Sequence, residues 1–410
     1  MKARYQYRIY PTDQQRKDLA RVFGCVRVVW NDALALCKQS VSEASASTRS
    51  TKLPSNGDLQ KICITQAKKT EQRQWLGEIS CIPLQQSIAD LGVAYKNFFE
   101  SRKGKRKGAK INPPRFKRKD NQQTARFRKG GFSIKAAHVY LAKIGCIKTK
   151  WSRPLPSEPS SVTVIKDRAG RYFVSFVVEI ESEIRPAKNK AVGIDLGLKT
   201  FAALSTQELV NSPDYSQLDR KIRWSQRRLA RRQKNSKRRK RMRLRVAKLE
   251  ARRRDTRKDF LHKLSTKVVH ENQVIALEDL NVSGMLKNRC LSRSISQAGW
   301  REFRTMCEAK SDKFGREFVV INRWEPTSQV CSDCGYRWGK LDLSVREVIC
   351  INCGTHHDRD DNASKNIEKV GVGHTHDSKR TGRECKTSVE AVPVELSTHL
   401  EYEQVTLFDC

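Results

Sequence analysis

Polar and apolar residues alternate over the first ten positions, and aromatic residues are frequent among them. This alternation predicts a strand over residues 3–10 that ends at Pro11. The period then becomes helical, because Thr12 and Gln15 form a capping-box pattern and apolar residues recur up to Asn31. The apolar residues of this predicted helix are Leu19, Phe23, Val26 and Trp30.

A second helical stripe follows Pro83. Residues 41–58, between the two predicted helices, are rich in serine and threonine and contain Pro54 and Gly57, which predicts a loop. We interpret the second stripe as core packing of a helical lobe. Its residues are Leu84, Ile88, Leu91, Tyr95 and Phe98.

A β-rich region follows the helical lobe. The runs 161–165 and 172–180 are joined by Lys-Asp-Arg-Ala-Gly-Arg, a pattern typical of a hairpin. With residues 139–147 they predict a small barrel or sheet. We expect the strand over 3–10 to belong to it, so that the helical lobe is an insertion.

The pattern changes again after a linker at residues 186–190. Residues 191–204 predict a strand, a tight glycine turn and a second strand, with Asp195 among apolar residues. A buried carboxylate without a partner is costly, so a cation or a metal is expected beside it. The alternative, a turn or capping aspartate, is less compatible with the apolar residues on both sides.

A second short apolar strand, residues 273–281, delivers Glu278 and Asp279 at its end. A helix around Trp300 and Phe303 and another strand over 317–321 are predicted to follow. The sequence therefore places two acidic positions on two strands that are about 80 residues apart.

The charge of the chain indicates its partners. Of 410 residues, 82 are Lys or Arg and 44 are Asp or Glu, which gives a formal net charge of +38. Such a charge favours a polyanionic partner, and nucleic acid is the expected one. An acidic membrane surface is the competitor, but no basic helix carries bulky apolar residues on its other face. We also find no apolar run of 18 residues and no signal-type segment, so no membrane partner is expected.

Two segments concentrate the positive charge. Residues 102–119 are basic and punctuated by glycine and proline, and residues 220–258 hold 21 Lys or Arg against two acids. The second segment predicts a long helix or a helical hairpin with a thin apolar stripe. We expect both to contact phosphates, although a solvated face or a nuclear-localisation signal would have the same composition. The candidate contact residues are Arg115, Lys117, Arg118, Arg238, Arg239, Lys240 and Arg241.

Four cysteines form a pattern with metal chemistry. Cys331, Cys334, Cys350 and Cys353 follow the spacing C-x2-C-x15-C-x2-C, and a glycine follows each second cysteine. This spacing is typical of one structural zinc ion in a closed tetrahedral shell, and the alternative is two disulfides or idle thiols. The chain has thirteen cysteines, most of them scattered singly, which fits a reducing, intracellular compartment.

Three acidic residues suit a two-metal site. Asp195 and Glu278 lie on predicted strands, and Asp360 follows the cysteine cluster. Carboxylates of this kind hold Mg²⁺, and two ions can stabilise both oxygens of a phosphodiester displacement. Sequence order permits these three side chains to meet but does not require it.

Four stretches of this sequence resemble the TnpB family of insertion-sequence proteins, which are related to the type V CRISPR effectors. The likeness extends from Tyr10 to about Asn366. The stretches are Gly-Ile-Asp195-Leu-Gly, Leu-Glu278-Asp-Leu, Pro326-Thr-Ser-Gln-Val-Cys331-Ser-Asp-Cys334-Gly and Cys353-Gly-Thr-His-His-Asp-Arg-Asp360-Asp-Asn-Ala363.

The resemblance implies an RNA-guided DNA endonuclease. Asp195, Glu278 and Asp360 would bind two catalytic Mg²⁺ ions, with Asp360 chosen over Asp361 because it matches the Asp-x-Asn-Ala pattern of the family. A guide RNA from the transposon end would select double-stranded and single-stranded target DNA, and the protein would read a short motif beside the target. The implied setting is the prokaryotic cytoplasm, at the nucleoid.

The resemblance also implies a fold class, α/β with additional all-β and helical lobes, and a set of boundaries. These are a wedge-type β-barrel at 1–10 and 125–185, a helical recognition lobe at 11–124, a RuvC-like (RNase H) nuclease domain at 191–325 and 358–370, and a zinc ribbon that binds target nucleic acid at 326–357. Residues 371–410 lack periodicity, which predicts a flexible tail. The tail contains His374, His376 and Cys385, whose spacing does not support a metal site.

Three rival interpretations remain open at this point. A miniature type V CRISPR-like effector has the same parts. A DDE transposase shares the fold class, but its third acid is normally a glutamate. A zinc-ribbon regulator would bind DNA without cutting it.

Overall fold

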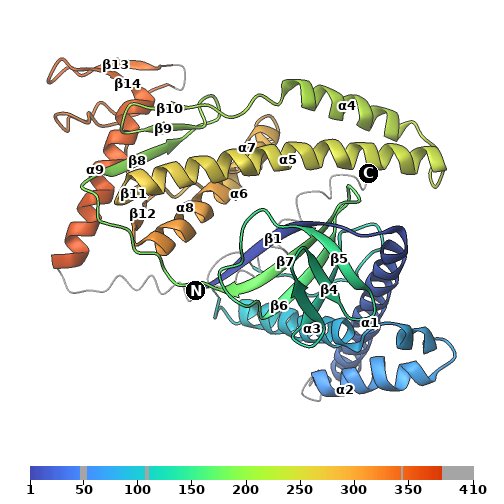
Figure 1. Cartoon of the computed structure of the whole chain (residues 1–410). Coiled ribbons are helices and arrows are strands. Elements are labelled where there is room, and N and C mark those ends of the chain that lie inside the picture. The colour runs from blue at the N-terminus through green and yellow to red at the C-terminus, as the bar shows by residue number, and fades with distance from the viewer. Residues whose placement is uncertain (47–52, 107–109, 343–344, 381–410) are drawn as a thin grey trace. The chain divides into compact units, whose positions relative to one another are not determined.

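The computed structural model describes residues 1–46, 53–106, 110–342 and 345–380. The chain divides after Ile180 into two compact units, which are described separately (Figure 1). Among the described residues, no helix is long and apolar enough to cross a membrane.

The first unit contains a seven-stranded antiparallel sheet in the order β2-β6-β7-β1-β5-β4-β3. The N-terminal strand β1 pairs with both β7 and β5, although more than 130 residues separate them. The predicted strand over 139–147 is in fact two strands that turn at Lys143, whose φ is 62°. The strands are β1 (Lys2–Tyr10), β2 (Gln123–Arg128), β3 (Phe132–Lys135), β4 (His138–Leu141), β5 (Gly145–Lys150), β6 (Ser161–Lys166) and β7 (Tyr172–Glu179).

Two long helices, α1 (Asp13–Ala46) and α3 (Cys81–Arg102), pack against each other in the first unit. The predicted end of α1 at Asn31 was wrong, because buried Ala33, Leu34 and Cys37 continue its apolar stripe. The predicted loop at 41–58 was therefore only partly correct, and residues 47–52 lie outside the described residues. The shorter elements are α2 (Asn56–Gln60), a π-helix (Lys61–Gln66) and two 3₁₀ helices (Ala67–Lys69 and Gln74–Glu78).

The second unit contains a five-stranded mixed sheet in the order β10-β9-β8-β11-β12. Strand β11 runs parallel to both β8 and β12, whereas β9 is antiparallel to β8 and β10. The carboxyl ends of β8, β11 and β12 therefore lie at one edge. The strands are β8 (Ala191–Leu196), β9 (Ala202–Leu204), β10 (Leu209–Val210), β11 (Val274–Glu278) and β12 (Glu317–Ile321).

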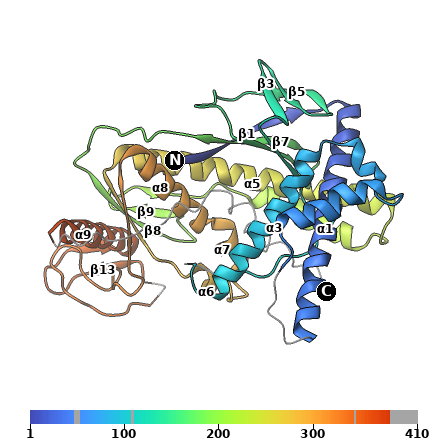
Figure 2. The same ribbon diagram turned by 90° about the horizontal axis from the view of Figure 1, so that it is seen from below.

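Helices cover both faces of this sheet (Figures 1 and 2). Val192 and Ile194 of β8 share a core with α5 (Lys237–Glu271) and α8 (Trp300–Phe314). The opposite face packs against α9 (Arg359–Arg380), through a smaller cluster of Ala276, Ile321 and Ile367. The remaining helices are α4 (Ser216–Ala230), α6 (Val282–Met285) and α7 (Ser292–Ala298).

Helix α9 corrects the prediction of a flexible tail from Gly371. The helix continues to Arg380, and Gly371 is buried against Ala276 of β11, where a Cβ would lie only 2.4 Å from the Ala276 side chain. Glycine at this position lets the helix backbone approach the sheet. The rest of the predicted tail, residues 381–410 with Cys385, lies outside the described residues.

Between β12 and α9 the chain forms a small lobe with a two-stranded ribbon, β13 (Glu347–Ile349) and β14 (His356–Asp358). The four cysteines of the sequence pattern lie in this lobe.

Candidate active site and zinc centre

Asp195 and Glu278 lie on neighbouring parallel strands. Leu277 pairs with Ile194, so the next residue of each strand, Glu278 and Asp195, lies at the carboxyl edge of the sheet. Side chains alternate along a strand, and Ile194 and Leu277 belong to the core under α5 and α8. The two carboxylates therefore face the side that α9 covers.

Asp360 reaches this side from the first turn of α9. The carboxylate of Asp358 accepts hydrogen bonds from the backbone N–H groups of Asp360 (2.9 Å) and Asp361 (3.0 Å), so it caps the helix. Gly193 brings the same helix onto β8: a Cβ there would lie 2.0 Å from the carbonyl oxygen of Ser364. A glycine two residues before Asp195 thus sets the distance between the sheet and the helix that carries Asp360.

The electrostatics of Asp195 link the three acids. Burial, and then the negative charges of Glu278 and Asp360, raise the pKa of Asp195 to about 7. Burial also raises the pKa of Glu278, and a hydrogen bond from Thr327 opposes this shift. Mutual repulsion of this kind is what a bound cation would relieve.

The neighbouring acids have other partners. Asp361 forms an ion pair with Lys365 at 2.9 Å, one turn further along α9. Asp279 accepts hydrogen bonds from Arg323 and, with a smaller effect, from Arg304, and these bonds hold its pKa below the usual range. Asp360 also has a cationic partner, Arg346 at 3.4 Å, but unlike Asp361 it is among the charges that raise the pKa of Asp195.

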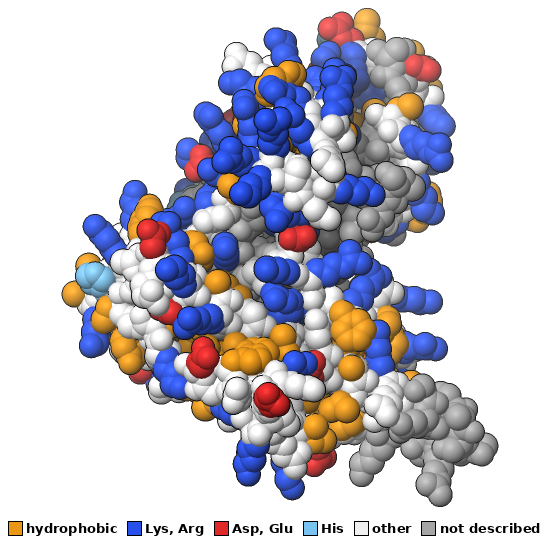
Figure 3. Space-filling view, turned by 90° about the vertical axis from the view of Figure 1, so that its right-hand side faces the viewer, with side chains coloured by type: hydrophobic (Ala, Val, Ile, Leu, Met, Phe, Trp, Pro, Cys, Tyr) orange, Lys and Arg blue, Asp and Glu red, His pale blue; other side chains and the backbone are white. Residues whose placement is uncertain are grey.

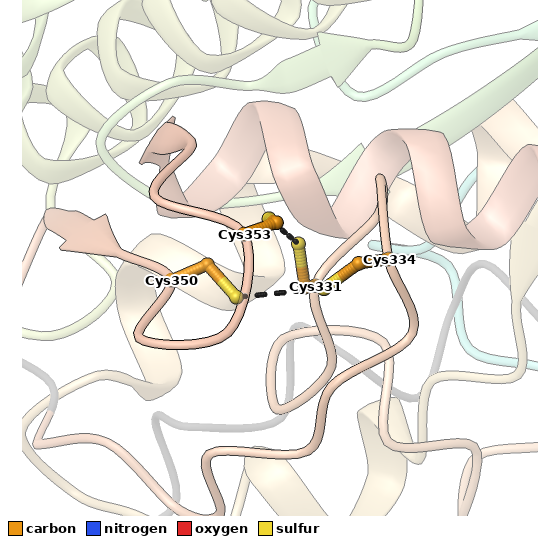
Figure 4. Close-up of side chains that lie close together, drawn as sticks. All are labelled: Cys331, Cys334, Cys350 and Cys353. Atoms are coloured by element: carbon orange, nitrogen blue, oxygen red, sulfur yellow. Dashed lines mark hydrogen bonds between the residues drawn. The ribbon is translucent and has the colours of Figure 1, made fainter.

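The four cysteines converge (Figure 4). The Sγ atoms of Cys331, Cys334, Cys350 and Cys353 all lie within 4.8 Å of one another, and the separations of Cys331–Cys353 and Cys334–Cys350 are 3.7 and 3.6 Å. A tetrahedral zinc with Zn–S bonds near 2.3 Å requires S···S separations of about 3.8 Å. Disulfides would need about 2.05 Å, so the thiols fit one zinc ion. Among the described residues, the carboxylates form no such compact group.

The turns at Cys331–Gly335 and Cys350–Gly354, the two zinc knuckles, have the same backbone geometry. Gly335 N–H donates to the carbonyl of Cys331, and Gly354 N–H donates to that of Cys350. Both glycines have positive φ, 77° and 72°, which explains why glycine follows each second cysteine. His357 is buried with Nε2 at 3.1 Å from Cys331 Sγ, so it contacts a sulfur of the centre.

A series of hydrogen bonds joins the zinc lobe to the carboxylates. Thr327 donates its hydroxyl to Oε1 of Glu278 at 2.5 Å. Asn366 of α9 donates to the carbonyls of Thr327 and Val330, both at 2.8 Å. Asn362 also donates to Val330 O, and it accepts from Ser332 N–H. Sequence reasoning missed these positioning residues, although two asparagines four residues apart on one helix were a usable signal.

Some of the predicted basic contact residues are exposed, and others already contact groups of this chain. Arg115 and Arg118 are exposed, but the ammonium of Lys117 lies 3.8 Å from the centre of the Trp30 ring, where burial lowers its pKa to about 8. The Asn31 side chain binds the backbone of Lys117 on both sides. The backbone carbonyl of Arg115 also accepts a hydrogen bond from the Trp30 indole at 3.1 Å, so Arg115 and Lys117 together fix the loop to α1. The side chain of Lys117 packs on Trp30, whereas those of Arg115 and Arg118 are exposed.

The predicted helical hairpin is formed by α4 and α5, and α5 continues to Glu271. Arg238, Lys240 and Arg241 are exposed, whereas the guanidinium of Arg239 donates to the carbonyls of Leu229 and Arg232 at the end of α4. Ion pairs of Asp219 with Arg253 and Arg293 supplement the thin apolar stripe. Lys and Arg side chains are spread over the visible surface, with few acids between them (Figure 3).

Three family models match parts of this chain. The OrfB_IS605 model, described as a probable transposase, matches residues 175–289, and a model described as the Cas12f1-like TNB domain matches residues 300–367. A helix-turn-helix domain model matches residues 1–45. In the structure these residues form β1 and most of the single helix α1, without a second helix.

A protein from Streptomyces pristinaespiralis, named as a candidate RNA-guided DNA endonuclease, is 42% identical to this chain over 397 residues. The match covers 93% of this chain and 95% of that protein. This chain belongs to the TnpB family. The InsQ protein of Escherichia coli (strain K12), named in the same way, is 28% identical to it over 90% of this TnpB chain and 92% of its own length.

The TnpB chain also has the fold of a solved structure. It matches the protein in a cryo-EM structure of a Cas12f1–sgRNA–target DNA complex with a TM-score of 0.54 and 12% identity. The match covers 90% of the TnpB chain and 98% of that protein. This likeness shows a shared fold.

Proposed function

We propose that this TnpB protein is an RNA-guided DNA endonuclease, as its relatives are named. The observation that carries the proposal is the placement of Asp195 and Glu278 on adjacent parallel strands, with Asp360 close enough to raise the pKa of Asp195. Ligands of open α/β sheets bind at such carboxyl ends. Three acidic oxygen donors in a strongly basic chain fit metal-dependent chemistry on a phosphodiester.

Asp195, Glu278 and Asp360 would hold Mg²⁺. The donor set fits, because hard cations prefer carboxylate oxygens and because the acids repel one another without a cation. Two bound ions would stabilise the attacking water and the leaving 3′ oxygen. The chain itself orients Glu278 through Thr327 and holds Asp360 at the capped end of α9. The cysteines would hold one structural zinc, which leaves no open position for chemistry.

The exposed basic residues would bind the guide RNA and the target DNA. Phosphate contacts position a duplex without reading its sequence, so base pairing with the guide would select the target. The family relationship supports the finer assignments: a wedge-type barrel around β1–β7, a helical recognition lobe around α1–α3, and a RuvC-like nuclease domain formed by the mixed sheet and α9. A protein with these partners would act at the prokaryotic nucleoid.

The test is the separation of cutting from binding. The chain is purified with its co-purifying RNA, which is sequenced to define the guide, and incubated with matched target DNA and Mg²⁺. Asp195→Ala and Glu278→Ala should abolish cutting and preserve target binding. The matched control is Glu317→Ala, because Glu317 lies at the opposite end of β12 in the same sheet. Wild-type cutting rates in either carboxylate variant would refute the assignment. A non-cutting regulator would bind the target and leave it intact.

A further inference from the structure

Trp324 differs from the other tryptophans of the chain. It is 84% exposed and lies in the turn between β12 and the first zinc knuckle. Among the described residues, its ring has no aromatic or cationic partner. Trp300 is buried in the core, and each of the other five rings contacts a cationic or aromatic side chain. These contacts are Trp30 with Lys117, Trp75 with Arg73, Trp151 with Tyr7 and Phe176, Trp224 with Arg228 and Arg245, and Trp338 with His357.

The turn that carries Trp324 is fixed at both ends. Asn322 accepts hydrogen bonds from the N–H groups of Trp324 (3.2 Å, at Oδ1) and Glu325 (3.1 Å, at the carbonyl). The preceding residue, Arg323, binds Asp279, and Thr327 binds Glu278. The exposed ring is thus attached to an ordered backbone, so little conformational entropy would be lost when a ligand packs against it.

The turn leaves the sheet beside the candidate metal ligands. Ile321, the last residue of β12, is the register partner of Glu278, and its carbonyl accepts a hydrogen bond from the N–H of Asp279 at 3.2 Å. Trp324 follows three residues later. A large apolar side chain therefore remains exposed at the same edge that carries Asp195 and Glu278.

We propose that Trp324 is a stacking platform for an unpaired nucleobase of the DNA strand that this site cuts. The proposal rests on the proposed function. Base stacking on an aromatic ring is tolerant of sequence, and it requires a base whose face is not covered by its neighbours. A chain of net charge +38 attracts the phosphates of such a strand, whereas an exposed indole supplies the complementary surface for the base.

The proposal is tested by measuring the cutting rate of a series of targets, each with one abasic nucleotide at a different position of the cut strand. With wild-type protein, one position should slow cutting by about 5- to 150-fold, the range expected for one stacked base. Trp324→Ala should slow cutting of the intact target by a similar factor, with no further loss at that abasic position. Trp324→Phe should retain most of the rate. Leu209→Ala is the matched control, because Leu209 is 57% exposed on β10, the opposite edge strand of the sheet.

A binding measurement separates this proposal from the proposed function. An Asp195→Ala protein is mixed with a single-stranded oligonucleotide that carries 2-aminopurine, whose fluorescence is quenched by stacking. Additional Trp324→Ala should remove the quenching. Equal quenching in both proteins, or an abasic effect that persists in full without the indole, would overturn the stacking proposal. If quenching depends on Trp324 but the wild-type protein does not cut matched target DNA, the result would contradict the nuclease function and leave the stacking proposal supported.

Discussion

The hydroxyl of Thr327 donates a hydrogen bond to Oε1 of Glu278 at 2.5 Å, across 49 residues of sequence. Thr327 itself is held through its carbonyl by Asn366 of α9, the helix that also carries Asp360. The orientation of one candidate metal ligand therefore depends on the segment that leads into the zinc lobe.

Thr327→Val should slow cutting by about 10- to 100-fold, since hydrogen bonds to charged groups contribute roughly 1.5–3 kcal/mol. Thr327→Ser keeps the hydroxyl and should recover most of the rate. The cutting rate at saturating target, compared with target affinity, separates positioning from folding. Equal rates in the valine and serine variants would show that the hydrogen bond is not needed.

Gly193→Ala should displace α9 from β8. A Cβ would lie 2.0 Å from Ser364 O and 2.4 Å from Glu368 N, both backbone atoms that cannot move aside separately. We expect a loss of stability of about 3 kcal/mol or more and loss of cutting. Gly373→Ala is the matched control on the same helix, where a Cβ would meet nothing within 4 Å. Thermal melting of both variants provides the comparison, and an unchanged Gly193→Ala protein would contradict the close packing.

Cys334→Ser should release zinc and lower the stability of the lobe, because thiolate binding is coupled to local folding. Metal analysis of the wild type should give one zinc per chain. Cys290→Ser, at an exposed free cysteine of the same unit, should retain that zinc. A wild-type chain that contains no zinc would refute the assignment of this site.

Much of this architecture could be predicted from local patterns. The alternation before Pro11, the stripe after Pro83, the basic hairpin and the cysteine spacing all correspond to elements of the structure. Local patterns could not predict that Asp195 and Glu278 lie side by side, because this depends on the register of two strands about 80 residues apart in sequence. The prediction also ended helix α9 before Gly371, because a glycine at this position indicates a helix end. In the structure, Gly371 is required by its close contact with Ala276 of β11, which no local pattern shows.

Lys117 has a contact within the chain, with the Trp30 ring, that composition alone does not reveal. Burial lowers its pKa from 10.5 to about 8, so the folded chain binds fewer protons than the unfolded chain between these two values. The contribution of Lys117 to stability should therefore increase as the pH rises from about 8 to 10.5. Lys117→Met keeps the packing on Trp30 and should remove this increase. It should also stabilise the protein at pH 7 by up to about 3 kcal/mol, less the lost cation–π contact.

Melting temperatures between pH 7 and 10.5 test this difference, and Lys119→Met is the control in the same exposed segment. Parallel melting curves for wild type and Lys117→Met at all pH values would contradict the burial of a charged ammonium.

In the basic hairpin of α4 and α5, some residues should bind nucleic acid, and others should stabilise the hairpin itself. Arg238, Lys240 and Arg241 are exposed, so replacing all three by glutamine should weaken binding of guide RNA and target DNA. Each lost phosphate contact should reduce the slope of log affinity against log salt by roughly 0.9 for duplex DNA and about 0.7 for a single strand. The preferred targets should not change, because phosphates carry no base identity.

Arg239→Gln is the matched control, because its guanidinium is already bound to the carbonyls of Leu229 and Arg232. This variant should lower the melting temperature and leave the salt slope close to that of the wild type. The triple variant should show the reverse, a smaller slope at an unchanged melting temperature. If the triple variant keeps the wild-type affinity and slope for both nucleic acids, these three side chains belong to a solvated face, and the guide and target must be held elsewhere.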